Sequence, residues 1–119
     1  MKVLLVDDED NLRRLLRITL RSAGFEVLEA ANGFDALELS ENHRIDLLVT
    51  DVVMGAMDGL ALAHSLVDRQ PELPVVYISG FPLDFEAERR RLPRCAFVPK
   101  PFPPKVLLNI VASFAGAPQ

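Results

Sequence analysis

Four short apolar segments of this sequence end in polar side chains that could do chemistry. The polar residues at these ends are Asp7 and Asp8, Asp51, Ser79 and Lys100. Short apolar runs bounded by polar residues are typical of buried strands. Because open α/β sheets bind their ligands at the carboxyl ends of strands, we expect these side chains to gather at one edge of a sheet.

Such a group of residues suits phosphoryl chemistry assisted by a metal ion. Carboxylates that share a pocket repel one another unless a positive charge neutralises them. A small divalent cation does this, and a site with few protein ligands plus water suits Mg²⁺ better than Ca²⁺. A carboxylate beside Mg²⁺ is a competent nucleophile toward phosphorus and would form an aspartyl phosphate. Mg²⁺, the Lys100 ammonium and the Ser79 hydroxyl can then share the charge on the equatorial oxygens.

Each of these residues also has a purely structural explanation. Acids before a helix, such as Asp7 and Asp8, commonly cap it or interact with its dipole. A lysine before a proline is commonly a solvated surface residue. The placement of all of them at strand ends is what favours a site. Elsewhere we expect structural roles only: a helix cap at Asp58, surface positions for His43 and His64, a solvated helix face over 88–91, and packing by Cys95.

The elements that must position the site residues alternate strictly between strand and helix. Strands are predicted at 3–6, 25–30, 46–51, 75–79 and 96–98. Helices are predicted over about 10–23, 33–42, 59–68, 83–91 and 104–114. This pattern predicts an α/β protein with the flavodoxin-like (βα)5 fold: a five-stranded parallel sheet in the order 2-1-3-4-5 with helices on both faces. In the first helix we expect an apolar face of Leu12, Leu15, Leu16, Leu20 and, more loosely, Ile18, and outward-pointing side chains at Arg13, Arg14, Arg17 and Arg21.

Composition narrows the class of protein. The chain has 119 residues, room for one domain, which we assign to 1–115, with 116–119 as a frayed tail or the start of a linker. A net charge of −4 argues against direct nucleic-acid binding. No apolar run approaches the ~20 residues that span a bilayer, and the N-terminus does not resemble a signal peptide. Together with a single cysteine, this predicts a cytoplasmic domain without membrane contact.

Four motifs of the chain together resemble the receiver domain of two-component response regulators. They are Leu5-Val6-Asp7-Asp8-Glu9, the block from Asp51 through Met54 to Asp58-Gly59, Ile78-Ser79-Gly80, and Lys100-Pro101-Phe102. The resemblance covers the chain from end to end. The version Ile78-Ser79-Gly80-Phe81 resembles the receivers of hybrid sensor histidine kinases, which would make this chain a piece of a larger protein.

The resemblance implies a role for each residue of the group. Asp51 would accept the phosphoryl group; Asp7, Asp8, Asp51 and the backbone carbonyl of Val53 would hold Mg²⁺; Ser79 and Lys100 would contact the phosphoryl group; and Ser79 and Phe97 would be the switch residues. The family also carries a cis peptide bond at the position of Lys100-Pro101, which is rare for peptide bonds in general.

The implied function is a signalling switch that catalyses only its own phosphorylation and dephosphorylation. A histidine kinase or a histidine phosphotransfer protein would be the donor. The surface of the fourth helix, fifth strand and fifth helix would then change its preference for a downstream partner. The resemblance also implies that two copies of the domain form a dimer on phosphorylation.

Two residues depart from the usual family pattern. Gly55 replaces a proline, so we expect a more mobile loop, and Gly80 replaces an alanine, which would open the pocket slightly. In receivers the residues two after the phosphoacceptor and two after the hydroxyl flank the path of an attacking water. Here these are Val53 and Phe81, whose side chains cannot hydrogen-bond water. We therefore expect slow self-dephosphorylation, unless Phe81 merely packs against the fourth helix.

Three other functions are weighed against this one. A phosphatase of the haloacid-dehalogenase type would use Asp8 of Asp8-Glu9-Asp10 as its nucleophile, but Leu12 stands where that class prefers threonine or valine, and the chain is short for that fold. A pseudo-receiver that only binds partners would not need the complete set of site residues. A flavin-binding protein would need a phosphate-cradling loop where Asp7-Asp8-Glu9 would repel the ligand.

Overall fold

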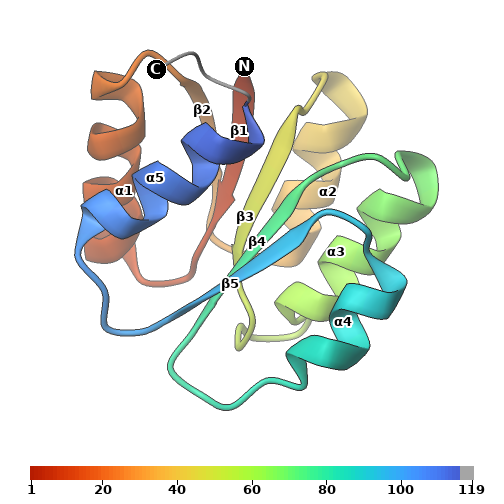
Figure 1. Ribbon diagram of the computed structural model, residues 1–119. Coiled ribbons are helices and arrows are strands. Elements are labelled where there is room, and N and C mark those ends of the chain that lie inside the picture. Colours follow the sequence, from red (N-terminus) through yellow and green to blue (C-terminus); the bar gives the residue numbers. More distant parts are fainter. Residues whose placement is uncertain (116–119) are drawn as a thin grey trace.

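The computed structural model describes residues 1–115, in which five strands and five helices alternate along the chain (Figure 1). The strands are β1 (Lys2–Val6), β2 (Glu26–Ala30), β3 (Leu47–Asp51), β4 (Val75–Ser79) and β5 (Cys95–Pro99). The helices are α1 (Asp10–Ser22), α2 (Gly33–Asn42), α3 (Gly59–Arg69), α4 (Phe85–Arg91) and α5 (Pro104–Phe114). The predicted tail, 116–119, lies outside the described residues.

The five strands form one parallel sheet in the order β2-β1-β3-β4-β5, which confirms the predicted topology. Strand β3 pairs with β1 on one side and with β4 on the other, so these three strands form the middle of the sheet. Their carboxyl ends bring Asp7, Asp51 and Ser79 to the same edge. Lys100 reaches that edge from the end of β5.

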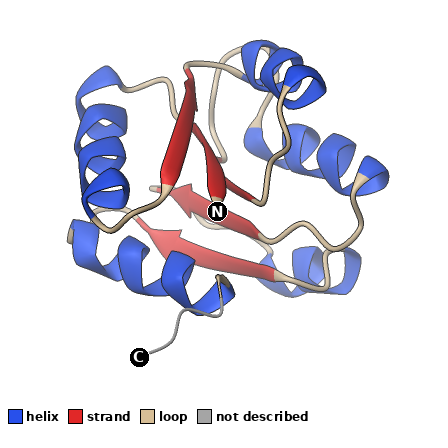
Figure 2. Ribbon diagram, turned by 90° about the horizontal axis from the view of Figure 1, so that it is seen from above, coloured by secondary structure: helices blue, strands red, loops and turns tan. Residues whose placement is uncertain are grey.

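Each strand contributes side chains to two separate cores, because successive side chains point to opposite faces of a sheet. In β1, Val3 and Leu5 pack in the core under α1 and α5. Leu4 and Val6 pack on the other face, in the core covered by α2 and α3. Figure 1 shows α1 and α5 on one side of the sheet and α2, α3 and α4 on the other, and Figure 2 shows the strands between the two layers of helices. Burial on both faces explains why the middle strands read as continuous apolar runs.

The helices begin and end close to the predicted residues, and the start of α4 differs most. The Asp58 carboxylate accepts a hydrogen bond from the Ala61 N–H, which confirms the predicted cap of α3. Helix α4 begins at Phe85 rather than near Leu83, because the Asp84 carboxylate accepts from the Ala87 N–H and so sets the start of the helix. Within residues 1–115 no helix combines the length and the apolar character needed to cross a membrane.

Several predictions about single side chains are wrong. Leu15 is 47% exposed, because the apolar stripe of α1 is wider than the strip covered by the sheet and α5. Arg13 is half-buried in a network of ion pairs and does not simply point outward. Glu88, expected on a solvated face, is buried and accepts hydrogen bonds from two other elements. His64, expected to be a surface residue, is half-buried and one of those two partners.

Candidate functional site

Three carboxylates meet at the carboxyl edge of the sheet. Asp7 and Asp8 stand in the loop after β1, and Asp51 is the last residue of β3. One oxygen from each can be chosen so that all three lie within 4.8 Å of one another. Asp7 and Asp51 are buried, whereas Asp8 is exposed at the mouth of the cluster. The gathering expected from the strand ends is therefore present.

The two oxygens of the Asp7 carboxylate have different surroundings. Its Oδ1 accepts a hydrogen bond of 2.8 Å from the Glu9 N–H. Among residues 1–115 no group donates a hydrogen bond to its buried Oδ2. Burial raises the pKa of the Asp7 carboxyl, and the Glu9 N–H and the charge of Lys100 offset this only in part.

This donor set fits Mg²⁺. Carboxylate oxygens are the hard ligands that this ion prefers, and three of them from two loops leave room for the water that it retains. A buried carboxylate oxygen without a hydrogen-bond donor is also the kind of atom that a cation satisfies. Asp7, Asp8 and Asp51 are thus residues that could hold the metal ion.

Lys100 places its ammonium between two of these acids. Its Nζ lies 3.1 Å from Asp51 Oδ2 and 3.4 Å from Asp7 Oδ2. Burial lowers the pKa of Lys100, but the neighbouring Asp51 and Asp7 outweigh it, so that the pKa lies above its ordinary value. The peptide bond between Lys100 and Pro101 is cis, as predicted. Lys100 is therefore a charged group in direct contact with Asp51.

Ser79 is the last residue of β4 and is buried. Its Oγ accepts a hydrogen bond of 3.0 Å from the Phe81 N–H. Its carbonyl accepts one of 2.7 Å from the backbone N–H of Lys100. These two bonds connect the loop after β4 and the end of β5 to the same residue. A displacement of Ser79 would therefore disturb a hydrogen bond in each segment.

Gly59 approaches the backbone of Asp51 more closely than any other residue type could. Its N–H donates to the Val52 carbonyl at 2.8 Å. A Cβ at this position would lie 2.0 Å from the Asp51 carbonyl oxygen and 3.0 Å from Thr50 Oγ1. A side chain here would have to push the end of β3 away. The glycine thus allows α3 to begin directly beneath Asp51.

Phe97 connects β5 to helix α4. It lies half-buried on β5 opposite Tyr77 of β4. Its ring and that of Phe85 in α4 have centroids 6.1 Å apart and are tilted by 35°. This contact is a typical aromatic pair, and it joins β5 to α4.

The rim of the site carries two exposed apolar side chains. Val53 is 52% exposed and Phe81 is 63% exposed. Such exposure is not that of a residue packed beneath α4, so packing against that helix does not account for Phe81. A Cβ on Gly80 would lie 3.9 Å from Lys100 Cβ, an ordinary contact, so the alanine usual in the family would also fit.

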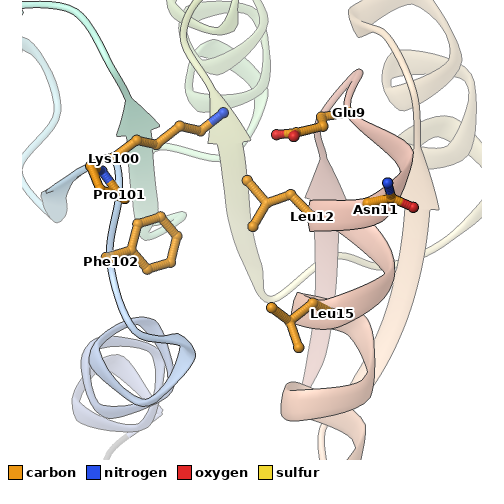
Figure 3. Close-up of a pocket in the computed structure, with 7 residues that line it drawn as sticks. All are labelled: Glu9, Asn11, Leu12, Leu15, Lys100, Pro101 and Phe102. Carbon is orange, nitrogen blue, oxygen red and sulfur yellow. The ribbon is translucent and has the colours of Figure 1, made fainter.

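A groove of about 340 Å³ lies beside the site, between the start of α1 and the loop that follows β5 (Figure 3). Its lining residues are Glu9, Asn11, Leu12, Leu15, Lys100, Pro101 and Phe102. Figure 3 shows the Phe102 ring and the side chain of Leu12 on opposite walls, with the Lys100 ammonium at one end. The groove is therefore apolar along its walls and charged where it meets the site.

Sequence reasoning missed Arg13 as a neighbour of the site. Its Nη1 donates a hydrogen bond of 2.7 Å to the Asp7 carbonyl. Its spacing from Leu16 and Leu20 (i, i+3, i+7) is the signal that could have found it, because this spacing places Arg13 beside the buried stripe of α1 and Arg14 on the exposed side. Glu29 on β2, beside α1, is the partner toward which Arg13 turns.

Comparison with known proteins shows to which family the chain belongs. Residues 3–112 match the family described as the response regulator receiver domain. The chain belongs to this family. Receiver domains act as signalling switches in two-component systems and bind Mg²⁺ at an acidic pocket, and the cluster of Asp7, Asp8 and Asp51 corresponds to such a pocket.

Individual relatives point in the same direction. The receiver is 42% identical over 114 residues to the sensor kinase CckA of Brucella abortus, an alignment that covers 92% of this chain and 12% of that kinase. A crystal structure of the receiver domain from the hybrid histidine kinase CckA superimposes with a TM-score of 0.80 at 36% identity and covers 96% of this chain and 98% of that one. The chemotaxis protein CheY4 of Vibrio cholerae gives a TM-score of 0.85 at 28% identity, with 95% and 97% covered. The chain thus spans about an eighth of the CckA kinase to which it is similar.

Proposed function

We propose that this receiver is a phosphoacceptor switch in which Asp51 takes a phosphoryl group from a phosphohistidine in an Mg²⁺-dependent step. The observation that carries the proposal is the position of Asp51. Its carboxylate ends the central strand β3, belongs to the acidic cluster, and lies 3.1 Å from the Lys100 ammonium. A nucleophilic oxygen, an acidic metal pocket and a fixed cation therefore share one edge of the sheet.

Asp7, Asp8 and Asp51 would hold the Mg²⁺ ion, with the backbone carbonyl of Val53 as a further ligand. When bound, the ion would neutralise the acids and draw charge from the phosphoryl oxygens. The buried Asp7 Oδ2 atom accepts no hydrogen bond among the described residues and has only the Lys100 ammonium 3.4 Å away, so it could also serve as a metal ligand.

The transfer itself would consist of one bond made and one bond broken. A carboxylate oxygen of Asp51 would form a bond to phosphorus while the N–P bond of the phosphohistidine breaks and its electron pair returns to the imidazole. The Lys100 ammonium would move from the Asp51 carboxylate to a phosphoryl oxygen. The Ser79 hydroxyl would donate to another. All three groups act by position and charge, as phosphoryl transfer requires.

The signal would leave the site through Ser79 and Phe97. The Ser79 Oγ accepts a hydrogen bond from the Phe81 N–H, so a movement of Ser79 toward the phosphoryl group would disturb that bond. Phe97 would follow into the space that becomes free, and its contact with Phe85 would change the surface of α4, β5 and α5. That surface would select the downstream partner, including a second phosphorylated receiver. This is a two-state equilibrium biased by one local charge.

The similarity to CckA bears on the partners. A receiver within a hybrid kinase exchanges phosphoryl groups with histidine-containing domains, so we infer a histidine kinase or a histidine phosphotransfer protein as the donor. The reaction would be the only chemistry of the domain. We expect it to work in the cytoplasm, without contact with membrane or nucleic acid.

The direct test is to incubate the protein with a small acyl phosphate and Mg²⁺ and measure its intact mass. Wild type should gain one phosphoryl group, and Asp51→Asn should gain none. Chelation of the metal should abolish the gain. No gain on wild type would reject the proposal, and an equal gain on both proteins would place the nucleophile elsewhere.

A further inference from the structure

The guanidinium of Arg13 is held by three acceptors from three different segments. Its Nη1 donates to the Asp7 carbonyl at 2.7 Å. Its Nη2 lies 2.7 Å from Asp10 Oδ1, and its Nε lies 3.3 Å from Glu29 Oε1. The side chain is only 16% exposed. Such a fork of directed bonds fixes a guanidinium in one orientation, which a single exposed ion pair does not.

Glu29 is a firm anchor for this network. Its second oxygen lies 2.7 Å from Arg17 Nη1, so two arginines of α1 form ion pairs with one carboxylate of β2. Burial would raise the pKa of Glu29, but Arg17 and Arg13 outweigh it and lower the pKa, which keeps the group ionised. The network therefore connects β2, α1 and the loop after β1.

The Asp7 carbonyl belongs to the peptide group that joins Asp7 to Asp8. A bond to this oxygen restrains the plane of that peptide, and with it the position of the Asp8 Cα from which the side chain leaves the backbone. Asp8 is exposed, so packing does not hold it in place. We propose that Arg13 is a positioning residue for the metal site: it orients the Asp7–Asp8 peptide so that both carboxylates converge on Mg²⁺. The proposal rests on the proposed function of the acidic cluster.

Charge and position predict opposite effects of removing Arg13. A positive side chain near a cation site weakens cation binding, so its loss should tighten Mg²⁺ binding if only charge matters. If Arg13 positions the acids, its loss should weaken Mg²⁺ binding instead. Loss of groups that orient metal ligands typically costs about 10–100-fold in affinity. The sign of the change therefore separates the two explanations.

The experiment compares the Mg²⁺ dissociation constants of wild type, Arg13→Met, Arg13→Lys and Arg14→Met by calorimetry. Arg14 is the matched control, because it is the next residue of α1, is exposed, and its side chain makes no hydrogen bond or ion pair with residues 1–115. Arg13→Lys keeps the charge but replaces the planar fork of three nitrogens with a single ammonium, which does not reproduce its directed bonds. Both Arg13 variants should bind Mg²⁺ about tenfold or more weakly, and Arg14→Met should bind it as well as wild type or slightly better.

Two further readouts separate positioning from loss of stability. Without metal, the Glu9 amide, which donates to Asp7 Oδ1, should exchange its hydrogen faster in Arg13→Lys than in wild type, while core amides are unchanged. At saturating Mg²⁺ the rate of phosphorylation by an acyl phosphate should return to the wild-type value. Mg²⁺ binding by Arg13→Lys that equals wild type, or tighter binding by Arg13→Met, would overturn the inference alone. A wild type that binds no Mg²⁺ would reject the proposed function as well.

Discussion

At the scale of single residues, the central feature is one lysine shared by two carboxylates. Lys100 Nζ contacts both Asp51 and Asp7, so part of the repulsion within the cluster is already offset by the protein itself. A metal ion held by the three acids would share Asp7 and Asp51 with Lys100, whereas Asp8 at the exposed mouth is not a partner of Lys100. The two kinds of residue should respond differently to mutation.

Asp8→Ala should weaken Mg²⁺ binding and phosphorylation together, because one charged ligand is lost from a site with few. A loss of about tenfold in affinity corresponds to ~1.4 kcal/mol. Lys100→Ala should bind Mg²⁺ at least as tightly as wild type, since an ammonium and a metal cation repel, yet it should slow phosphorylation. Calorimetry and intact-mass time courses measure the two effects. A large loss of Mg²⁺ affinity in Lys100→Ala would show that Lys100 has been assigned the wrong role.

Gly59→Ala should destabilise the domain and disturb the site, since the new Cβ would meet the Asp51 carbonyl at 2.0 Å. Overpacking of this kind costs about 1–3 kcal/mol in the free energy of unfolding. Gly55→Ala is the matched control, because a Cβ there meets nothing within 4 Å. Urea unfolding of both variants measures the difference. Equal stability of the two would contradict the close approach.

The lifetime of the phosphorylated state should be long, because the exposed side chains of Val53 and Phe81 flank the site and offer no hydrogen bond to an attacking water. The comparison is the decay of phosphorylated wild type against a Val53→Asn, Phe81→Glu variant in Mg²⁺, followed by intact mass. The variant should lose its phosphoryl group faster. Equal rates of decay would show that Val53 and Phe81 do not protect the phosphoryl group from water.

At the scale of elements, α4 is a short helix held against its neighbours by one buried carboxyl group and by the contact of Phe85 with Phe97. Glu88 Oε1 accepts a hydrogen bond of 2.7 Å from the Tyr77 hydroxyl of β4 and lies 2.8 Å from His64 Nε2 of α3. The helix has seven residues, too few to be stable without such contacts. The surface proposed to select partners thus depends on a polar cluster rather than on a deep apolar face.

Glu88→Ala should therefore lower the free energy of unfolding by about 1–3 kcal/mol, because the Tyr77 hydroxyl loses its buried partner. Amides of α4 should also exchange faster. Glu86→Ala is the control from the same helix, since Glu86 is exposed and its pair with Arg89 is of a kind worth little. Indistinguishable stabilities of the two variants would mean that the cluster does not hold α4 in place.

The same cluster predicts a loss of stability at alkaline pH. Burial and then the bond to Glu88 raise the pKa of Tyr77 well above its ordinary value. The unfolded chain therefore releases the phenolic proton first, near pH about 10, so the native state binds more protons and stability falls as pH rises further. The contribution of Tyr77 should vanish in Tyr77→Phe, whereas that of Lys100, whose pKa is also raised, should remain. Tyr77 is the only tyrosine of the chain, so tyrosinate absorbance reports this group alone, and titration of the folded protein at an ordinary pKa would contradict the prediction.

At the scale of the whole molecule, the sequence predicted the topology because each apolar run could only be a strand buried between two layers of helices. The same logic predicted the site, since parallel strands deliver the residues at their ends to one edge. What could not be predicted is the partner that a polar side chain finds on another element. The spacing of Arg13 from Leu16 and Leu20 places it beside the core, but it does not predict the bonds to Asp7 and Glu29. Glu88 sits among charged neighbours of the same appearance, and only the position of Tyr77 distinguishes it.

The central claim is that Asp51 carries the phosphoryl group. The measurement that tests this most directly is to phosphorylate the protein, reduce the acyl phosphate with borohydride, and locate the resulting homoserine by peptide mass spectrometry. We predict homoserine at position 51 in wild type, and none in protein treated without Mg²⁺. Homoserine at position 8 would instead indicate phosphatase-like chemistry at Asp8, and its absence from position 51 would contradict the account.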